Sequence, residues 1–111
     1  MDVFFQNGRL AKLCGDGPTR TKRLGVERGK KVLLRLNQIT SADNLADLCL
    51  LPQARCHQLK KNRDEQFSLD LDGPYRLIVE VADAPVPRRT DGGIDLSLVR
   101  ALRVLEITDT H

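Results

Sequence analysis

Apolar and polar residues alternate on both sides of a tight turn in the second half of this chain, and this pattern constrains its fold most. The turn is Asp72-Gly73, a dipeptide favoured in hairpins because its residues accept positive φ angles. The apolar positions, each two residues from the next along its strand, are Phe67, Leu69, Leu71, Leu77, Val79 and Val81. Since alternate side chains of a strand point to opposite faces, the pattern predicts an antiparallel hairpin with one apolar face that other elements must cover.

The first half of the chain has its apolar residues at helical spacing instead. This spacing predicts a helix that Asn7 caps and that runs to residue 15, a longer basic amphipathic helix over residues 19–40, and a short third helix capped by Ser41. We expect the long helix to be loosened near Gly25 and Gly29, because a glycine in a helix interior costs about 1 kcal/mol.

Three further strands are predicted around the hairpin, over residues 1–5, 55–59 and 98–108. Strict alternation in the last of them would place Ile107 on the face opposite Val104. Apolar residues would then lie on both faces, as is typical of a well-covered strand. Proline and glycine are frequent in residues 82–97, which predicts a long loop.

Together these elements predict an α+β fold in which N-terminal helices pack on one face of a twisted, mainly antiparallel sheet and leave the other face partly open. A chain of 111 residues with 41% apolar residues is suited to one core, so we expect one domain over residues 1–111. No apolar run approaches the roughly 20 residues that span a bilayer, and Asp2 argues against a signal peptide. These features favour a cytoplasmic protein.

The three cysteines, Cys14, Cys49 and Cys56, are an odd set without a Cys-x-x-Cys pair. This argues against a disulfide framework or a structural zinc site, and we expect buried or incidental thiols. Cys56 is next to His57 and could in principle pair with it as nucleophile and base, but neighbours on a strand point to opposite faces, which argues against this pairing.

Positive charge is clustered along the chain. Residues 1–36 carry nine basic and three acidic side chains, and residues 54–63 carry four basic and none acidic. Such clustering favours a polyanionic partner more than the formal net charge of +3 does. A solvated basic helix face is the alternative explanation for the N-terminal group.

Three short motifs occur in a fixed order. They are His57-Gln58-Leu59-Lys60 with Arg63 close behind, Gly73-Pro74-Tyr75-Arg76-Leu77 at the start of a strand, and Asp109-Thr110-His111. With the leucine-rich helical region before them, they make the chain resemble the HigB-type toxins of the RelE/ParE superfamily, also called plasmid maintenance killer proteins. The resemblance covers nearly the whole chain.

This resemblance implies a RelE-like fold and a ribosome-dependent mRNA endonuclease that enters the A site and cuts without a metal or other cofactor. It also implies a HigA-like antitoxin of the helix-turn-helix kind as partner. Pro74 and Thr110 depart from the family pattern, which usually has asparagine and an aromatic residue there. By motif position, the catalytic candidates are His57, Lys60, Arg63, Arg76, Asp109 and His111.

The two histidines suit the acid and base of a 2′-hydroxyl attack on the adjacent phosphate, because imidazole exchanges protons near neutral pH. A strand histidine held by the sheet is the alternative role for His57, and a chain-terminal residue without a role is the alternative for His111. Asp109 would orient His111 or cap the sheet.

The basic candidates Lys60, Arg63 and Arg76 would hold the phosphate and stabilise the charge that develops on it. Arg76 is the strongest candidate of the three, because a cation next to Tyr75 in an otherwise apolar strand indicates a functional role. Its alternative role is an ion pair with Glu80 on the same strand.

Other residues are predicted to bind RNA without taking part in the chemistry. Arg55 and Lys61 would steer phosphates, and Phe67 and Tyr75 offer stacking surfaces for bases, although both also fit core positions. Basic helix residues are predicted to contact ribosomal RNA, and these are Lys22, Arg23, Lys30, Lys31 and Arg35.

Two other functions remain open. A ParE-like inhibitor of DNA gyrase would use the same fold without the set of histidines and cations. A degenerate toxin homologue that binds RNA or an antitoxin would be consistent with Pro74 and Thr110.

Overall fold

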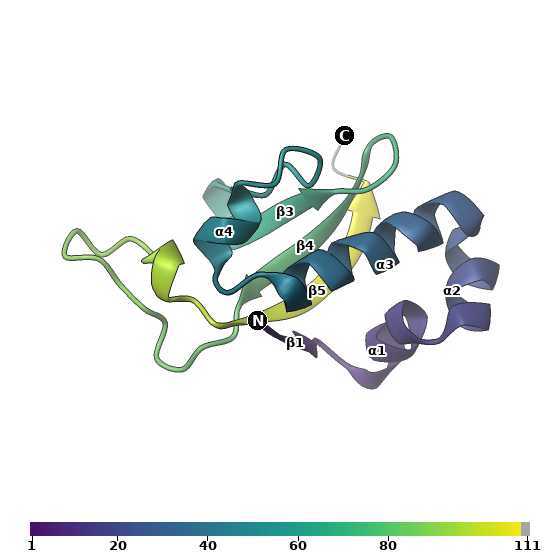
Figure 1. Cartoon of the computed structure of the whole chain (residues 1–111), viewed down its shortest axis with the longest axis horizontal. Helices are drawn as coiled ribbons and strands as arrows, with labels where there is room; N and C mark the ends of the chain where they lie inside the picture. The colour runs from purple at the N-terminus through teal and green to yellow at the C-terminus, as the bar shows by residue number, and fades with distance from the viewer. Residues whose placement is uncertain (110–111) are drawn as a thin grey trace.

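A mixed five-stranded sheet and the helices that cover it form the two layers of this protein (Figure 1). The computed structural model describes residues 1–109. Its strands are β1 (Asp2–Phe5), β2 (His57–Gln58), β3 (Gln66–Asp70), β4 (Tyr75–Val81) and β5 (Ala101–Asp109). Its helices are α1 (Gly8–Gly15), α2 (Gly17–Leu24), α3 (Val26–Ser41), α4 (Leu45–Cys49) and the single 3₁₀ turns η1 (Lys61–Arg63) and η2 (Leu96–Leu98). The α+β prediction is confirmed.

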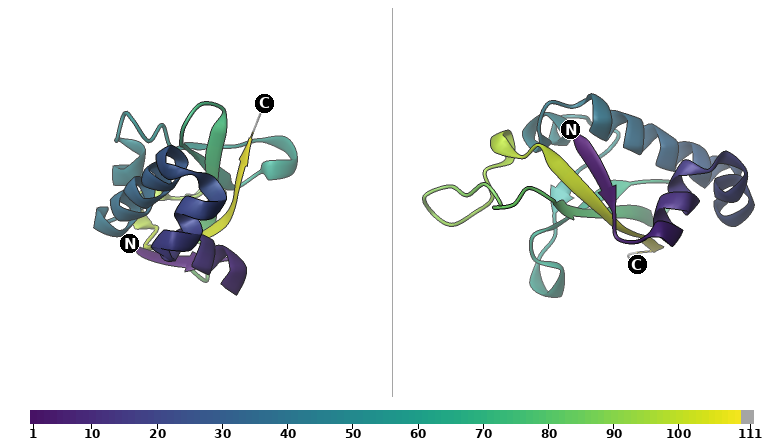
Figure 2. Two further views of the ribbon diagram at one scale, coloured as in Figure 1. Left: turned by 90° about the vertical axis from the view of Figure 1, so that its right-hand side faces the viewer. Right: turned by 90° about the horizontal axis from the view of Figure 1, so that it is seen from below.

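The strand order in the sheet is β1-β5-β4-β3-β2, and β1 pairs parallel to β5 while the other pairs are antiparallel. Figure 2 shows α3 on one side of this sheet and the segment that contains η1 on the other. In the described part of the chain, no helix has the length and apolar character needed to cross a membrane.

The predicted hairpin is confirmed, with β3 and β4 joined through a turn in which Gly73 has a φ of +52°. Its covered face packs against α3 and α4 through fully buried apolar side chains. This core includes Val32, Ile39, Leu45, Leu48, Phe67, Leu69, Leu77, Val79, Leu102 and Val104. Burying each such side chain contributes roughly 1.5–3 kcal/mol, so this face determines how the layers pack.

A bulge in β5 makes the prediction of strict alternation wrong. Ile78 pairs with Glu106 but Val79 pairs with Val104, so Leu105 is an extra residue between the two pairs. Ile107 therefore lies opposite Leu77 on the covered face, the same face as Val104. The bulge shifts the register of β5 against β4 by one residue, which alternation in a single strand cannot reveal.

The single helix predicted over residues 19–40 is in fact two helices, α2 and α3, which meet at Gly25. Gly25 has a φ of +81° and a ψ of 165°, a conformation that is essentially restricted to glycine. The first turn of α2 contains Pro18 and is capped by Asp16, whose side chain accepts from the Thr19 N–H at 3.0 Å. Because of the backbone angles of Gly25, the chain turns sharply between α2 and α3, whereas the sequence predicted only a loosened helix there.

Two other boundaries also differ from the prediction. Asn44, and not Ser41, caps the short helix α4, because its side chain accepts from the Asp47 N–H, while Ser41 still belongs to α3. Only His57 and Gln58 of residues 55–59 join the sheet ladder. The predicted cap of α1 by Asn7 is confirmed. Most of residues 82–97 form the expected loop, with one isolated bridge inside it, while residues 96 and 97 belong to η2.

Candidate functional site on the open face of the sheet

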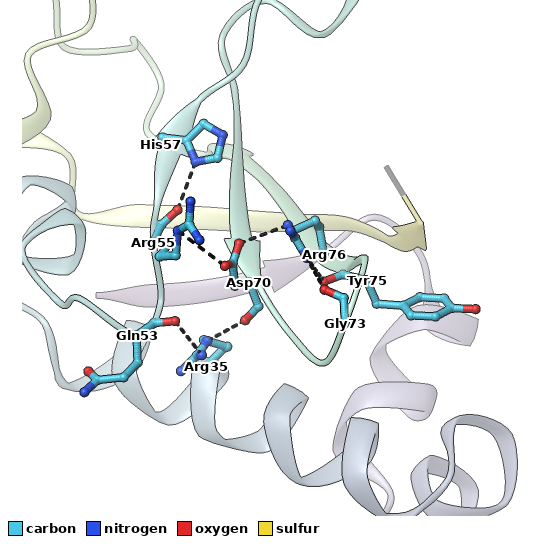
Figure 3. Close-up of polar contacts among 8 residues, drawn as sticks. All are labelled: Arg35, Gln53, Arg55, His57, Asp70, Gly73, Tyr75 and Arg76. Carbon is cyan, nitrogen blue, oxygen red and sulfur yellow. Dashed lines mark hydrogen bonds and ion pairs between the residues drawn. The ribbon is translucent and has the colours of Figure 1, made fainter. Parts of the chain in front are cut away.

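The face of the sheet turned away from the helices brings together residues from four segments of the chain. Residue pairing across β2, β3, β4 and β5 places His57 beside Ser68, and Arg76 between Asp70 and Thr108. Because directly paired residues share a face, His57, Asp70 and Arg76 all lie on this open face. Figure 3 shows them with the loop residue Arg55.

Asp70 is the centre of this group, and sequence analysis missed it. One of its carboxylate oxygens lies 2.9 Å from Nε of Arg76, and the other lies 3.6 Å from Nε of Arg55. Because two guanidinium groups pair with one carboxylate, the cluster of Arg55, Asp70 and Arg76 has a net charge of +1. The signal for Asp70 was present in the hairpin, since the Asp72-Gly73 turn sets the register that pairs residue 70 with residue 76.

Arg76 is held from several directions. Besides Asp70, its Nη1 donates to the carbonyl oxygens of Gly73 and Tyr75, at 2.8 Å each (Figure 3). Its side chain is 18% exposed. The alternative pairing with Glu80 does not occur, because Glu80 accepts from Arg103 at 2.8 Å. Arg76 is thus fixed in direction, and its side chain is still partly accessible.

His57 is exposed and has a defined tautomer. Its Nδ1 lies 2.9 Å from the carbonyl oxygen of Arg55. A carbonyl oxygen can only accept, so Nδ1 carries the hydrogen, and in the neutral ring the lone pair is on Nε2. Arg55 supports this contact through a left-handed backbone with a φ of +46°. His57 is therefore oriented to accept a proton at Nε2.

Arg63 belongs to the same face but has a structural role there. It donates to Gln66 on β3 at 3.1 Å and forms an ion pair with Glu106 on β5 at 3.4 Å. Since β4 lies between these strands, Arg63 spans it, and Ile78 of β4 is fully buried although it belongs to the open face. Arg63 thus holds the η1 segment on the sheet.

Lys60 and Asp109 are the remaining catalytic candidates that the structure describes. Lys60 and Lys61 are exposed at the start of η1. Asp109 ends β5 and pairs with Tyr75, so the register puts it on the face of Tyr75 and Leu77 and not on that of Arg76. His111 lies outside the described residues, so its predicted role is untested.

Two predicted RNA contacts are wrong because their side chains are buried. Phe67 is 1% exposed and belongs to the core. Arg35 is 2% exposed and donates from Nε to the carbonyl oxygen of Asp70 at 2.7 Å and from Nη2 to that of Gln53 at 2.8 Å. Burial lowers the pKa of this guanidinium, although the Asp70 charge opposes the shift. Arg35 fixes the strand and loop that carry the site.

Tyr75 is half-buried, and one face of its ring is already covered. The guanidinium carbon of Arg28 lies 3.4 Å from the ring centroid, and Asp72 holds Arg28 at 2.9 Å. A base could stack only on the remaining surface of this ring. The helix residues Lys22, Arg23 and Lys30 are exposed, as an RNA contact requires.

A second basic surface lies between α1 and α2, at the end of the molecule away from the loop of residues 82–97 (Figure 1). We call it the basic groove. It has a volume of about 740 Å³ and is lined by Arg9, Lys12, Leu13, Thr19, Lys22, Arg23 and Leu24. Four cations and no acidic side chain line it, which favours a polyanion. Sequence analysis named Lys22 and Arg23 but missed Arg9 and Lys12, whose spacing of three places both on one side of α1.

No protein-family profile matches this chain, and no curated protein matches it significantly.

Proposed function

We propose that this protein is the toxin of a type II toxin-antitoxin system, an endoribonuclease that cuts ribosome-bound mRNA without a metal. The observation that carries this proposal is the shared open face of His57 and Arg76. The two residues lie two strands and two positions apart, roughly 12 Å between Cα atoms. This separation leaves room for one phosphodiester group between an imidazole and a guanidinium.

The attack step of the proposed chemistry uses groups that lie on this face. Nε2 of His57 accepts the proton of the 2′-hydroxyl, and the 2′-oxygen attacks the adjacent phosphorus. Arg76 stabilises the additional negative charge of the phosphorane, and Asp70 keeps its guanidinium in position. The 5′-oxygen leaves with a proton, giving a 2′,3′-cyclic phosphate and a free 5′-hydroxyl. The resemblance assigns the acid to His111, with Asp109 to orient it and Lys60 beside the phosphate.

The basic groove supports RNA as the ligand. It is separate from the open face, so it would bind the phosphate backbone of a large RNA while the open face acts on a single strand. Ribosomal RNA at the A site is such a partner. A cognate HigA-like antitoxin and a cytoplasmic location belong to the same proposal and rest on the resemblance.

Primer extension on mRNA in a translating extract tests the proposal. We expect ribosome-dependent cuts by the wild type and a loss on the order of 10²–10³-fold for Arg76→Ala, with a loss also for His57→Ala and His111→Ala. Arg103→Ala is the matched control, because Arg103 is also an ion-paired arginine on the open face. The proposal fails if the wild type leaves no ribosome-dependent cuts, or if the Arg76 and histidine variants cut as well as the wild type.

Arg63 and Arg76 are both engaged with carboxylates, which favours binding without cleavage as a second candidate. Under this candidate the protein is a ParE-like gyrase inhibitor or a degenerate homologue that binds RNA or the antitoxin. A DNA supercoiling assay separates the two classes. Inhibition of gyrase by a wild type that does not cut mRNA would favour the second.

A further inference from the structure

Two cysteines that are seven positions apart in the sequence meet in the fold. Cys49 is the last residue of α4, and Cys56 directly precedes β2. Their Sγ atoms lie 3.3 Å apart, while both residues are free thiols. The chain between them turns back through the left-handed residue Arg55.

We propose that Cys49 and Cys56 form a reversible intramolecular disulfide when the protein meets a small oxidant such as glutathione disulfide. The bond requires the sulfur atoms to approach by a little over 1 Å, to about 2.05 Å. This proposal rests on the geometry of the two thiols and does not depend on the RNA-cleaving function.

The surroundings of the two thiols set the order of attack. Cys49 is half-buried, whereas Cys56 is 8% exposed and belongs to the core. The hydrogen bond between them lowers the pKa of Cys49, and burial opposes this shift. The same hydrogen bond, followed by burial and by the charge of Cys49, raises the pKa of Cys56. Cys49 is therefore the more accessible sulfur and the better thiolate.

The exchange takes place in two balanced steps. The Cys49 thiolate attacks one sulfur of glutathione disulfide and releases one glutathione thiolate, which takes up a proton. Cys56 then loses its proton and attacks Sγ of Cys49, and the second glutathione leaves as a thiolate that is protonated in turn. The protein loses two protons and two electrons, and the two glutathione molecules that form carry them away.

The disulfide would join the end of α4 to the residue before His57. Cys56 points to the core and His57 to the open face, as expected for neighbours entering a strand. Oxidation would thus restrain the loop of residues 50–55, in which Arg55 accepts the hydrogen bond of His57.

Thiol counting and peptide mapping on the full chain test the proposal. The native reduced protein is incubated with glutathione disulfide, then denatured and alkylated. We expect one alkylated cysteine in place of three and a protein mass lower by about 2 Da before alkylation. Trypsin cleaves after Arg35, Arg55 and Lys60, so the disulfide should join peptides 36–55 and 56–60 until a reductant is added.

Single serine variants supply the controls. Cys14 is fully buried in α1, and Cys14→Ser should form the same disulfide as the wild type. Cys49→Ser and Cys56→Ser should lose it, and Cys56→Ser should instead keep a glutathione adduct on Cys49. Three alkylatable thiols after oxidation of the wild type would overturn the proposal. A linked peptide that contains Cys14, or cross-linking only between chains, would overturn it as well.

Discussion

Asp70 on β3 and Arg76 on β4 face each other across the hairpin, with a carboxylate oxygen of Asp70 2.9 Å from Nε of Arg76. Both side chains are mostly covered, at 17% and 18% exposure. This pair orients Arg76 toward the open face and also compensates its charge. The carboxylate therefore limits how strongly Arg76 can hold a phosphate before RNA binds.

Asp70→Asn should strengthen RNA binding, because it removes the charge that compensates Arg76 and keeps a side chain of the same shape. We expect one more effective phosphate contact, so the slope of log affinity against log salt should steepen by roughly 0.7. Fluorescence anisotropy with a labelled single-stranded RNA at several salt concentrations measures the affinity and this slope.

Asp91→Asn is the control for the Asp70 variant. It removes the same charge from an ion-paired aspartate in the loop of residues 82–97. An equal gain in RNA affinity for both variants would show that only net charge matters and that the Asp70–Arg76 pair does not set the binding strength.

Removing two cations from the basic groove should weaken binding to a folded RNA. We expect the double variant Lys12→Gln/Lys22→Gln to lower the affinity and to flatten its salt dependence, because fewer counterions are released. Arg89→Gln/Arg100→Gln removes the same charge from exposed residues outside the groove. Filter binding to ribosomal RNA fragments compares the two, and equal losses would argue against the groove as an RNA site.

Arg35→Ala should destabilise the protein by about 2–4 kcal/mol, because the carbonyl oxygens of Asp70 and Gln53 would lose their buried donor. Arg35→Lys should recover part of the lost stability. The recovery should be incomplete, because an ammonium group can donate to fewer acceptors in the same space than a guanidinium can. Lys30→Ala, an exposed change on the same helix, should alter stability by less than about 0.5 kcal/mol. Urea unfolding measures all three, and a small loss for Arg35→Ala would contradict the structural role.

Asp16 should make stability depend on pH in the acid range. The Thr19 hydroxyl, and then the Thr19 backbone N–H, donate to its carboxylate and lower its pKa in the folded state. A lowered folded pKa means that this contribution is present above the unfolded pKa of about 3.9 and is lost as the pH falls through the folded value.

Asp16→Asn tests this contribution, because asparagine is also a good N-cap but does not titrate. The advantage of the wild type in Tm at pH 7 should shrink steadily as the pH is lowered below about 4. A constant difference between the two melting curves at every pH would contradict the assignment.

Local patterns in the sequence were sufficient for several parts of the fold. The alternation from Phe67 to Val81 around Asp72-Gly73 predicted the hairpin, and Asn7 correctly marked the start of α1. These features depend on residues that are close in the sequence, so they can be predicted without knowing the tertiary contacts. Gly25 was noticed as a weak point of a helix, but its backbone angles, which separate α2 from α3, depend on how the two helices pack.

The sequence by itself determined the fold class, the apolar face of the hairpin, and the presence of many basic side chains and two imidazoles. Only the tertiary structure decided which of these groups meet. Arg35 and Phe67 proved to be buried, Asp70 joined Arg55 to Arg76, and Cys49 came to lie beside Cys56. The physical reason is that strand register, the bulge at Leu105 and the packing of α3 and α4 are set by contacts between distant residues, and a local pattern does not specify those contacts.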